Sequence, residues 1–130
     1  MENFLAMKII DLAVCEFWLD GELSSPSCVL FIKDQHQNCW KAFFDDEENL
    51  WRLHSTDEAF PSVGWETGDR EMLWRDIRPD GASKVIGYAV ASITVFDDQL
   101  NGGLILKFQN GASIALSHNY RADTTSFAIE

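Results

Sequence analysis

LILKFQNGASIAL, residues 104–116, is the stretch that most clearly decides the fold. A two-residue Asn-Gly turn in this stretch would mix apolar and polar side chains on each face of a hairpin. A three-residue loop instead gives a register in which one face is wholly apolar, with Phe108 opposite Ala112, Leu106 opposite Ile114, and Leu104 opposite Leu116. The sequence therefore predicts a bulged β-hairpin in which Gly111 adopts the left-handed backbone conformation that a side chain would strain.

Short runs of β-branched and aromatic residues, separated by turn formers, predict further strands. The runs lie at residues 12–19, 28–33, 39–44, 50–54, 85–96, 104–108, 112–116 and 127–129. The run 85–96 is apolar on both alternating faces, which predicts a strand buried on two sides and bent near Gly87 or Ala91-Ser92. Residues 2–10 and 69–76 fit either a short helix or a strand. We expect a mainly β fold, an antiparallel β-sandwich or half-open barrel of about seven strands with one or two short helices.

The chain length and the net charge limit the number of domains and the classes of partner. The 130 residues predict a single domain, 1–130, because no repeat or flexible linker divides them. Asp and Glu number 21 against 10 Lys and Arg, so the net charge is -11. Such a chain is repelled by phosphate backbones and anionic lipids, and we expect neither nucleic acid nor membrane as a partner. The acids are densest in residues 45–80, and two interpretations of the net charge remain open: it attracts a basic protein partner, or it only keeps the protein soluble.

Cysteine usage and the N-terminus indicate the compartment. The chain has three cysteines, Cys15, Cys28 and Cys39. This number is too small for the disulfide framework of a small secreted domain. The first residues lack the positive charge and the uninterrupted apolar run of a signal peptide, and no window reaches the ~20 apolar residues of a membrane helix. We therefore expect a cytoplasmic protein.

The sequence contains no complete motif for binding a metal or a cofactor. His36 and Cys39 are three residues apart and Cys28 could approach them, but a structural zinc site needs four ligands, usually in two such pairs. The acidic run 45–49 lacks the alternating ligands and central glycine of a calcium loop. No glycine-rich phosphate-binding motif is present. The sequence predicts no metal and no cofactor.

Nucleophilic catalysis is similarly disfavoured. Ser117 and His118 are neighbours on a predicted strand, and Asp97 begins the preceding loop. Neighbouring strand residues point to opposite faces, so Ser117 and His118 would not meet. We expect solvated residues at a strand end and no enzymatic activity.

The five tryptophans fall into two groups. Trp18 and Trp40 lie within apolar strand runs, which predicts that they fill the core. Trp51, Trp65 and Trp74 lie in the acidic middle of the chain. Two interpretations remain open for this second group: the rings anchor a binding surface, or they close a small core under a long connection.

Two stretches carry a family resemblance, FFDDEENLWRL at residues 43–53 and ITVFDD…GGLILKFQNGASIAL at residues 93–116. In these the chain resembles the small, acidic, tryptophan-bearing β-proteins that act as immunity partners of bacterial toxins, including those of contact-dependent growth inhibition systems. The resemblance implies a protein that is not an enzyme and that binds and neutralises a cognate basic toxin, such as a nuclease.

Under that hypothesis, acids steer the partner and tryptophans anchor it. The predicted partner-binding residues are Asp45, Asp46, Glu47, Glu48, Trp51, Asp57, Glu58, Trp65, Glu66, Asp69 and Glu71. The main alternative is a small-ligand or carbohydrate-binding β-domain, with tryptophans forming a stacking platform in a cleft. A third class is an enzyme on a β-scaffold, which requires a cleft holding His54, His118 or a carboxylate of perturbed titration.

Overall fold

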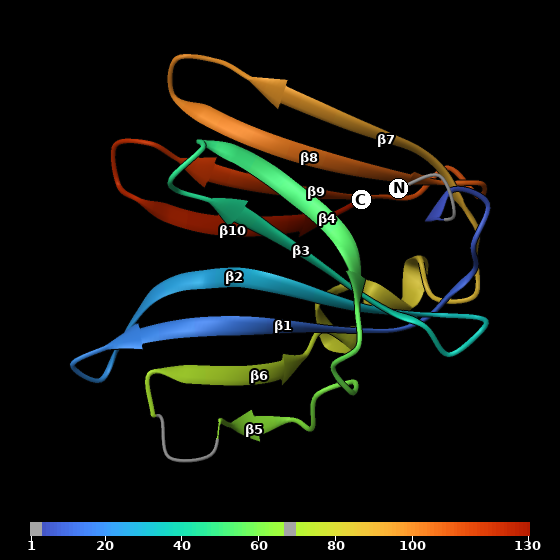
Figure 1. Ribbon diagram of the computed structural model, residues 1–130, viewed down its shortest axis with the longest axis horizontal. Coiled ribbons are helices and arrows are strands. Elements are labelled where there is room, and N and C mark those ends of the chain that lie inside the picture. The colour runs from blue at the N-terminus through green and yellow to red at the C-terminus, as the bar shows by residue number, and fades with distance from the viewer. Residues whose placement is uncertain (1–3, 67–69) are drawn as a thin grey trace.

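Ten strands build the molecule within residues 4–66 and 70–130, the part of the chain that the computed structural model describes (Figure 1). They are β1 (Ile9–Leu19), β2 (Glu22–Asp34), β3 (Cys39–Asp45), β4 (Leu50–Thr56), β5 (Gly64–Trp65), β6 (Met72–Asp76), β7 (Val90–Asp97), β8 (Asn101–Phe108), β9 (Ser113–Asn119) and β10 (Thr124–Ile129). In these residues, one sheet has the order β4-β3-β2-β1-β6-β5 and the other the order β10-β9-β8-β7. Every pair of neighbouring strands is antiparallel. The mainly β, antiparallel architecture that the sequence predicts is confirmed.

The hairpin of β8 and β9 has the predicted register. Leu104 pairs with Leu116 and Leu106 with Ile114. The Phe108 amide donates a hydrogen bond to the Ala112 carbonyl at 2.9 Å, and Gly111 has a φ of 90°. The apolar face of this hairpin is buried against residues of the larger sheet, among them Leu12, Val14, Leu30, Ile32 and Ala42. This face-to-face contact forms the main core.

A second, smaller core lies on the outer face of the larger sheet. Phe31 of β2 is buried there, and its ring makes edge contacts with Phe60 and Trp74, each at a centroid distance of 5.8 Å. Phe60 belongs to the connection between β4 and β5. Trp74 therefore helps to close a small core under a long connection, which is the second of the two interpretations offered for it.

Strand β7 differs from the prediction for residues 85–96. It begins only at Val90, after Gly87 with a φ of 92°, and its register shifts between Val90 and Ser92, at one of the two expected bends. Val95 is 57% exposed. The prediction of burial on both sides is wrong, because β7 is an edge strand with side chains open to solvent.

The helices also lie elsewhere than expected. Residues 72–76 form strand β6, which pairs with β1, so the helical alternative for residues 69–76 is wrong where the structure describes it. Residues 9–10 likewise belong to β1. Short 3₁₀ helices are found at Arg78–Asp80 and Ala82–Lys84. No helix in the described residues has the length and apolar character needed to cross a membrane.

Asp34 is a fully buried carboxylate that organises the turn between β2 and β3. Its Oδ1 accepts hydrogen bonds from the backbone amides of His36 and Asn38, at 2.8 and 3.1 Å. Its Oδ2 accepts one from the Trp40 indole Nε1 at 2.9 Å. The carboxylate thus satisfies three donors, and it ties the turn to a core tryptophan.

We expect Asp34→Ala to lower the free energy of unfolding by about 2–4 kcal/mol, because it leaves these donors without an acceptor. Urea denaturation followed by tryptophan fluorescence measures the change. His36→Ala, at an exposed position of the same turn, is the control and should shift stability by less than about 0.5 kcal/mol. Equal stability of the two variants would contradict this role of Asp34.

Candidate functional site

The candidate site is one end of the sandwich, where alternating strand directions bring five connections together. The links β1–β2, β3–β4, β7–β8 and β9–β10, and the described residues Glu66, Arg70 and Glu71 between β5 and β6, lie at this end, on the left in Figure 1. We call this region the acidic end, and define it by the acids of these links and of the strand residues flanking them: Asp20, Glu22, Asp45, Asp46, Glu47, Glu48, Glu66, Glu71, Asp97, Asp98 and Asp123. Within the described parts of the same links, the basic residues are Arg70 and Arg121. The local charge is therefore strongly negative.

Local hydrogen bonds keep part of this charge ionised. The Arg52 guanidinium donates to Asp45 Oδ2 at 2.7 Å, and this contact lowers the pKa of the Asp45 carboxyl. The backbone amides of Asn101 and Leu100 donate to Asp98 Oδ1 at 2.8 and 2.7 Å, and lower the pKa of that carboxyl. Both groups therefore hold their negative charge to a lower pH than free carboxyls do.

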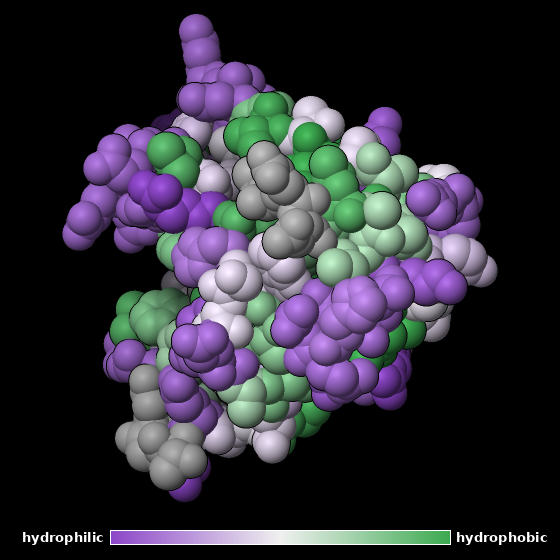
Figure 2. Space-filling model, turned by 45° about the vertical axis from the view of Figure 1, so that its right-hand side comes forward, coloured by the Kyte–Doolittle hydropathy of each residue, from purple (hydrophilic) through white to green (hydrophobic). Residues whose placement is uncertain are grey.

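Exposed apolar side chains lie among the acids. Those at or beside the acidic end are Leu19, Leu23, Leu50, Trp65, Val95 and Leu100, which are between 39% and 65% exposed. The Trp65 ring makes an edge contact with the half-buried Trp18 at a centroid distance of 6.0 Å. On the left of Figure 2, hydrophilic residues have single hydrophobic residues among them. Large apolar side chains within a polar surround are typical of protein interfaces.

A cavity of about 470 Å³ opens at the acidic end between the two sheets. Its lining comes from both sheets: Phe17, Leu19, Ser24, Ser25, Phe44, Asp46, Met72, His118, Ala122, Asp123 and Thr125. The Phe44 and His118 rings stack face to face across the sandwich, with centroids 3.9 Å apart and planes 4° apart. The cavity thus combines aromatic walls with acids.

His118 is a buried residue of this cavity, only 6% exposed. It lies on the same face of β9 as Ile114 and Leu116, which explains why the prediction of a solvated strand-end residue is wrong. Its Nε2 lies 3.3 Å from Asp123 Oδ1. Its Nδ1, and Oγ1 of the cross-strand neighbour Thr125, are buried without a hydrogen-bond partner.

Several predicted partner-binding residues do come together at the acidic end. They are Asp45, Asp46, Glu47, Glu48, Trp65, Glu66 and Glu71. All but the half-buried Asp45 are exposed. Asp69 lies outside the described residues.

Other predicted partner-binding residues lie elsewhere. Asp57 and Glu58 follow the far end of β4, at the opposite end of the sandwich, and Glu58 binds Lys41 at 2.6 Å, which lowers the pKa of its carboxyl. Trp51 is 7% exposed, and its Nε1 donates to the Gly102 carbonyl at 3.0 Å. Trp51 is thus a core residue and not a surface anchor, because its position on β4 faces the smaller sheet.

The acids that the other links contribute are not among the predicted partner-binding residues: Asp20, Glu22, Asp97, Asp98 and Asp123. They stand far from residues 45–80 in the chain. The alternation of strand direction could have indicated these acids, because the links that follow odd-numbered strands lie at the same end of an antiparallel fold. That signal needs a correct strand count, which the sequence did not provide.

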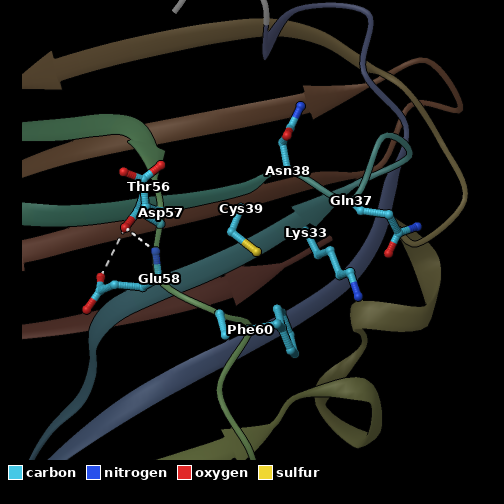
Figure 3. Close-up of a pocket in the computed structure, with 9 residues that line it drawn as sticks. Lys33, Gln37, Asn38, Cys39, Thr56, Asp57, Glu58 and Phe60 are labelled. Atoms are coloured by element: carbon cyan, nitrogen blue, oxygen red, sulfur yellow. Dashed lines mark hydrogen bonds between the residues drawn. The ribbon is translucent and has the colours of Figure 1, made fainter.

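The opposite end has a different character. It carries basic residues, among them Lys8, Lys33, Arg78, Lys84 and Lys107, together with acids, among them Asp11, Asp57, Glu58, Asp76, Asp80 and Glu130, so its charge is nearer to balance than that of the acidic end. A hollow of about 420 Å³ lies there, with Thr56, Asp57 and Glu58 across Cys39 from Lys33 (Figure 3). Burial raises the pKa of the Cys39 thiol, so the thiol is protonated at neutral pH and is a poor nucleophile.

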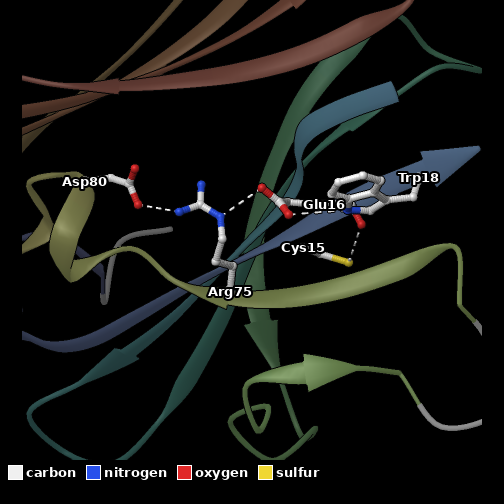
Figure 4. Close-up of polar contacts among 5 residues, drawn as sticks. All are labelled: Cys15, Glu16, Trp18, Arg75 and Asp80. Atoms are coloured by element: carbon white, nitrogen blue, oxygen red, sulfur yellow. Dashed lines mark hydrogen bonds and ion pairs between the residues drawn. The ribbon is translucent and has the colours of Figure 1, made fainter. Parts of the chain in front are cut away.

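A partly buried ion cluster lies on the larger sheet and reaches the link after β6 (Figure 4). Arg75 Nε donates to Glu16 Oε2 at 2.8 Å, its Nη1 pairs with Asp80, and its guanidinium lies 6.0 Å from the Phe127 ring centroid. Burial opposes the charge on Arg75, but the hydrogen bonds to Asp80 and Glu16 raise its pKa. Glu16 Oε1 also accepts from the Trp18 indole at 3.3 Å. The cluster therefore positions Trp18, which in turn contacts Trp65.

Comparison with known proteins gives no relative for the chain. A scan against protein-family models, a search of curated proteins and a search of solved structures each find no match. Among the described residues, no group of three or more His, Cys, Asp or Glu is placed to hold a metal ion. The side chain of Cys28, one of the zinc ligands considered, lies outside what the structure describes.

We expect Arg52→Gln to raise the pKa of the Asp45 carboxyl towards its ordinary value, because the charged hydrogen bond is lost. Carbon-detected NMR titration of side-chain carboxyls measures this directly. Arg121→Gln removes a positive charge from another link of the acidic end and should leave the Asp45 titration unchanged. An unaltered Asp45 titration in Arg52→Gln would refute the assigned contact.

Proposed function

We propose that this protein is an immunity protein whose acidic end binds and neutralises a basic protein toxin. The observation that carries the proposal is the gathering of carboxylates from five separate links on one end of a rigid sandwich. A partner with a complementary basic surface, such as a nuclease domain, suits this end. The family resemblance of residues 43–53 and 93–116 supports the same class of function.

The physics of capture favours this arrangement. A toxin must be bound before it acts, and opposite charges can raise association rates towards ~10⁸–10⁹ M⁻¹s⁻¹ at low salt. A standard interface buries ~800 Å² on each partner, which is about a tenth of the 7463 Å² surface of this protein. One end of the sandwich can provide that area.

Charge alone does not hold a complex together. Exposed ion pairs contribute little each, whereas desolvated aromatic and aliphatic side chains provide most of the binding free energy. Trp65, Leu19 and Leu23 are exposed near the acidic links and are suited to that role. Steering acids and apolar anchors therefore stand on one surface.

Binding of a small ligand or carbohydrate is the second candidate function. The cavity between Phe17, Phe44 and His118 favours it, because aromatic walls with a few polar groups are typical of ligand sites. Quenching of tryptophan fluorescence by sugars would favour this alternative, whereas toxin neutralisation would favour the immunity role.

Growth rescue tests the proposal. The chain is co-expressed with the C-terminal domain of the protein encoded by the neighbouring reading frame, and we expect that domain alone to arrest growth, the chain to restore it, and the two proteins to purify as a stoichiometric complex. Failure of the wild-type chain to protect would contradict the proposal.

Matched charge reversals test the surface. We expect Asp46→Lys/Glu47→Lys to slow association with the toxin at least about tenfold at low salt, with the difference shrinking at high salt because screening removes steering. Stopped-flow measurements over a salt series give the rates. Asp57→Lys/Glu130→Lys makes the same charge change at the opposite end and should have a much smaller effect. Equal slowing by both pairs would exclude the acidic end as the docking surface.

A further inference from the structure

We propose that the cavity at the acidic end is a receptor for the guanidinium group of an arginine side chain, inserted by the cationic partner between the two sheets. The inference rests on the proposed function for the identity of the partner. It adds the specific contact by which a basic protein is recognised.

The walls of the cavity suit a flat cation. Phe44 and His118 form a stacked pair on one side, and Phe17, Leu19 and Met72 add apolar surface. A guanidinium is planar and weakly hydrated, so it packs against aromatic faces more readily than a lysine ammonium does.

The polar groups near the mouth carry negative charge. Asp46 comes from the β3–β4 link and Asp123 from the β9–β10 link, so the two acids approach from different sheets. The Asp123 side chain is 80% exposed, and its Oδ1 lies 3.3 Å from His118 Nε2 at the cavity wall. No lysine or arginine is among the described residues lining the cavity. Anions are therefore disfavoured, and a cation can pair with carboxylates on both sides.

Two buried atoms in the wall lack a hydrogen-bond partner in the described structure. His118 Nε2 faces Asp123, and a neutral imidazole that donates from Nε2 has an acceptor at Nδ1. Nδ1 is unpartnered, and so is the Thr125 hydroxyl oxygen. Buried polar atoms without partners are rare because they cost stability, and they call for an explanation.

A guanidinium provides hydrogen-bond donors for the acceptors of this lining. It carries five N–H donors and no acceptor, whereas the cavity presents carboxylate oxygens, with the buried Thr125 hydroxyl and His118 Nδ1 in lining residues behind its surface. An inserted arginine can donate to both carboxylates, and the Thr125 hydroxyl and His118 Nδ1 are the nearby acceptors that still lack a partner. Charge, shape and hydrogen-bonding capacity thus point to the same ligand group.

Three short peptides test the inference without any toxin. The probes are acetyl-Gly-Arg-Gly-amide and its Lys and Gln counterparts, titrated into the full chain and followed by NMR. We expect the Arg peptide to shift the His118 ring and Thr125 amide signals saturably, the Lys peptide to bind more weakly, and the Gln peptide not to bind. Equal binding of Arg and Gln peptides, or of Arg and Lys peptides, would overturn the inference, as would Arg shifts that leave His118 and Thr125 unmoved.

Two variants and a control locate the contact. Asp46→Asn/Asp123→Asn should weaken binding of the Arg peptide about tenfold or more by removing both carboxylates. Asn tolerates the positive φ of 53° at position 123, and both positions are exposed, so the fold is retained. Thr125→Val should weaken binding with little change in shape, and Asp57→Asn at the opposite end should leave it unchanged. Equal weakening by Asp57→Asn would overturn the assigned position.

The outcomes separate this inference from the proposed function. If the chain neutralises its toxin but the Arg peptide does not bind the cavity, the arginine receptor is wrong and the proposed function stands. If the Arg peptide binds as expected but no toxin is neutralised, the receptor stands and the immunity role is wrong.

Discussion

The antiparallel alternation of ten strands is the constraint on which the rest of the structure depends. Each strand reverses the chain, so links that follow odd-numbered strands return to the same end of the sandwich. The links that carry acids from Asp20 to Asp123 thereby lie at one end of the sandwich (Figure 1). The opposite end receives the other links and a larger share of the basic residues. A charge asymmetry that the sequence shows only for residues 45–80 therefore extends over one whole end of the sandwich.

Packing between the sheets makes this end a defined surface. The β8–β9 hairpin buries an apolar face, and the β1–β2 pair buries another against it. Towards the acidic end the apolar contact gives way to the Phe44–His118 stack and then to an open cavity. The Glu16–Arg75 pair lies between the sheets as well, with the Arg75 guanidinium 6.0 Å from the Phe127 ring of β10. The acids are thus displayed on a rigid frame, which lowers the entropy cost of binding a partner.

How much the sequence could predict depended on the range of the interactions involved. The register of residues 104–116 is local, because the apolar pairs and one glycine determine it, and it was predicted correctly. The sequence predicts one binding surface for Trp51 and Asp57 because the two residues are close in the chain. Strand β4 separates its two ends by about 20 Å, and its alternation turns Trp51 inward. The burial of His118 depends on the opposing sheet, so no local pattern identified the cavity.

The most direct test of the account is a map of the electrostatic potential over the backbone. Cationic and anionic nitroxide cosolutes relax amide protons according to how closely each approaches, and the ratio of the two effects reports the local potential. The account predicts the most negative potentials at the amides of the β1–β2, β3–β4, β7–β8 and β9–β10 links, and potentials near zero around the β2–β3 and β8–β9 links. A uniform potential over both ends would contradict it.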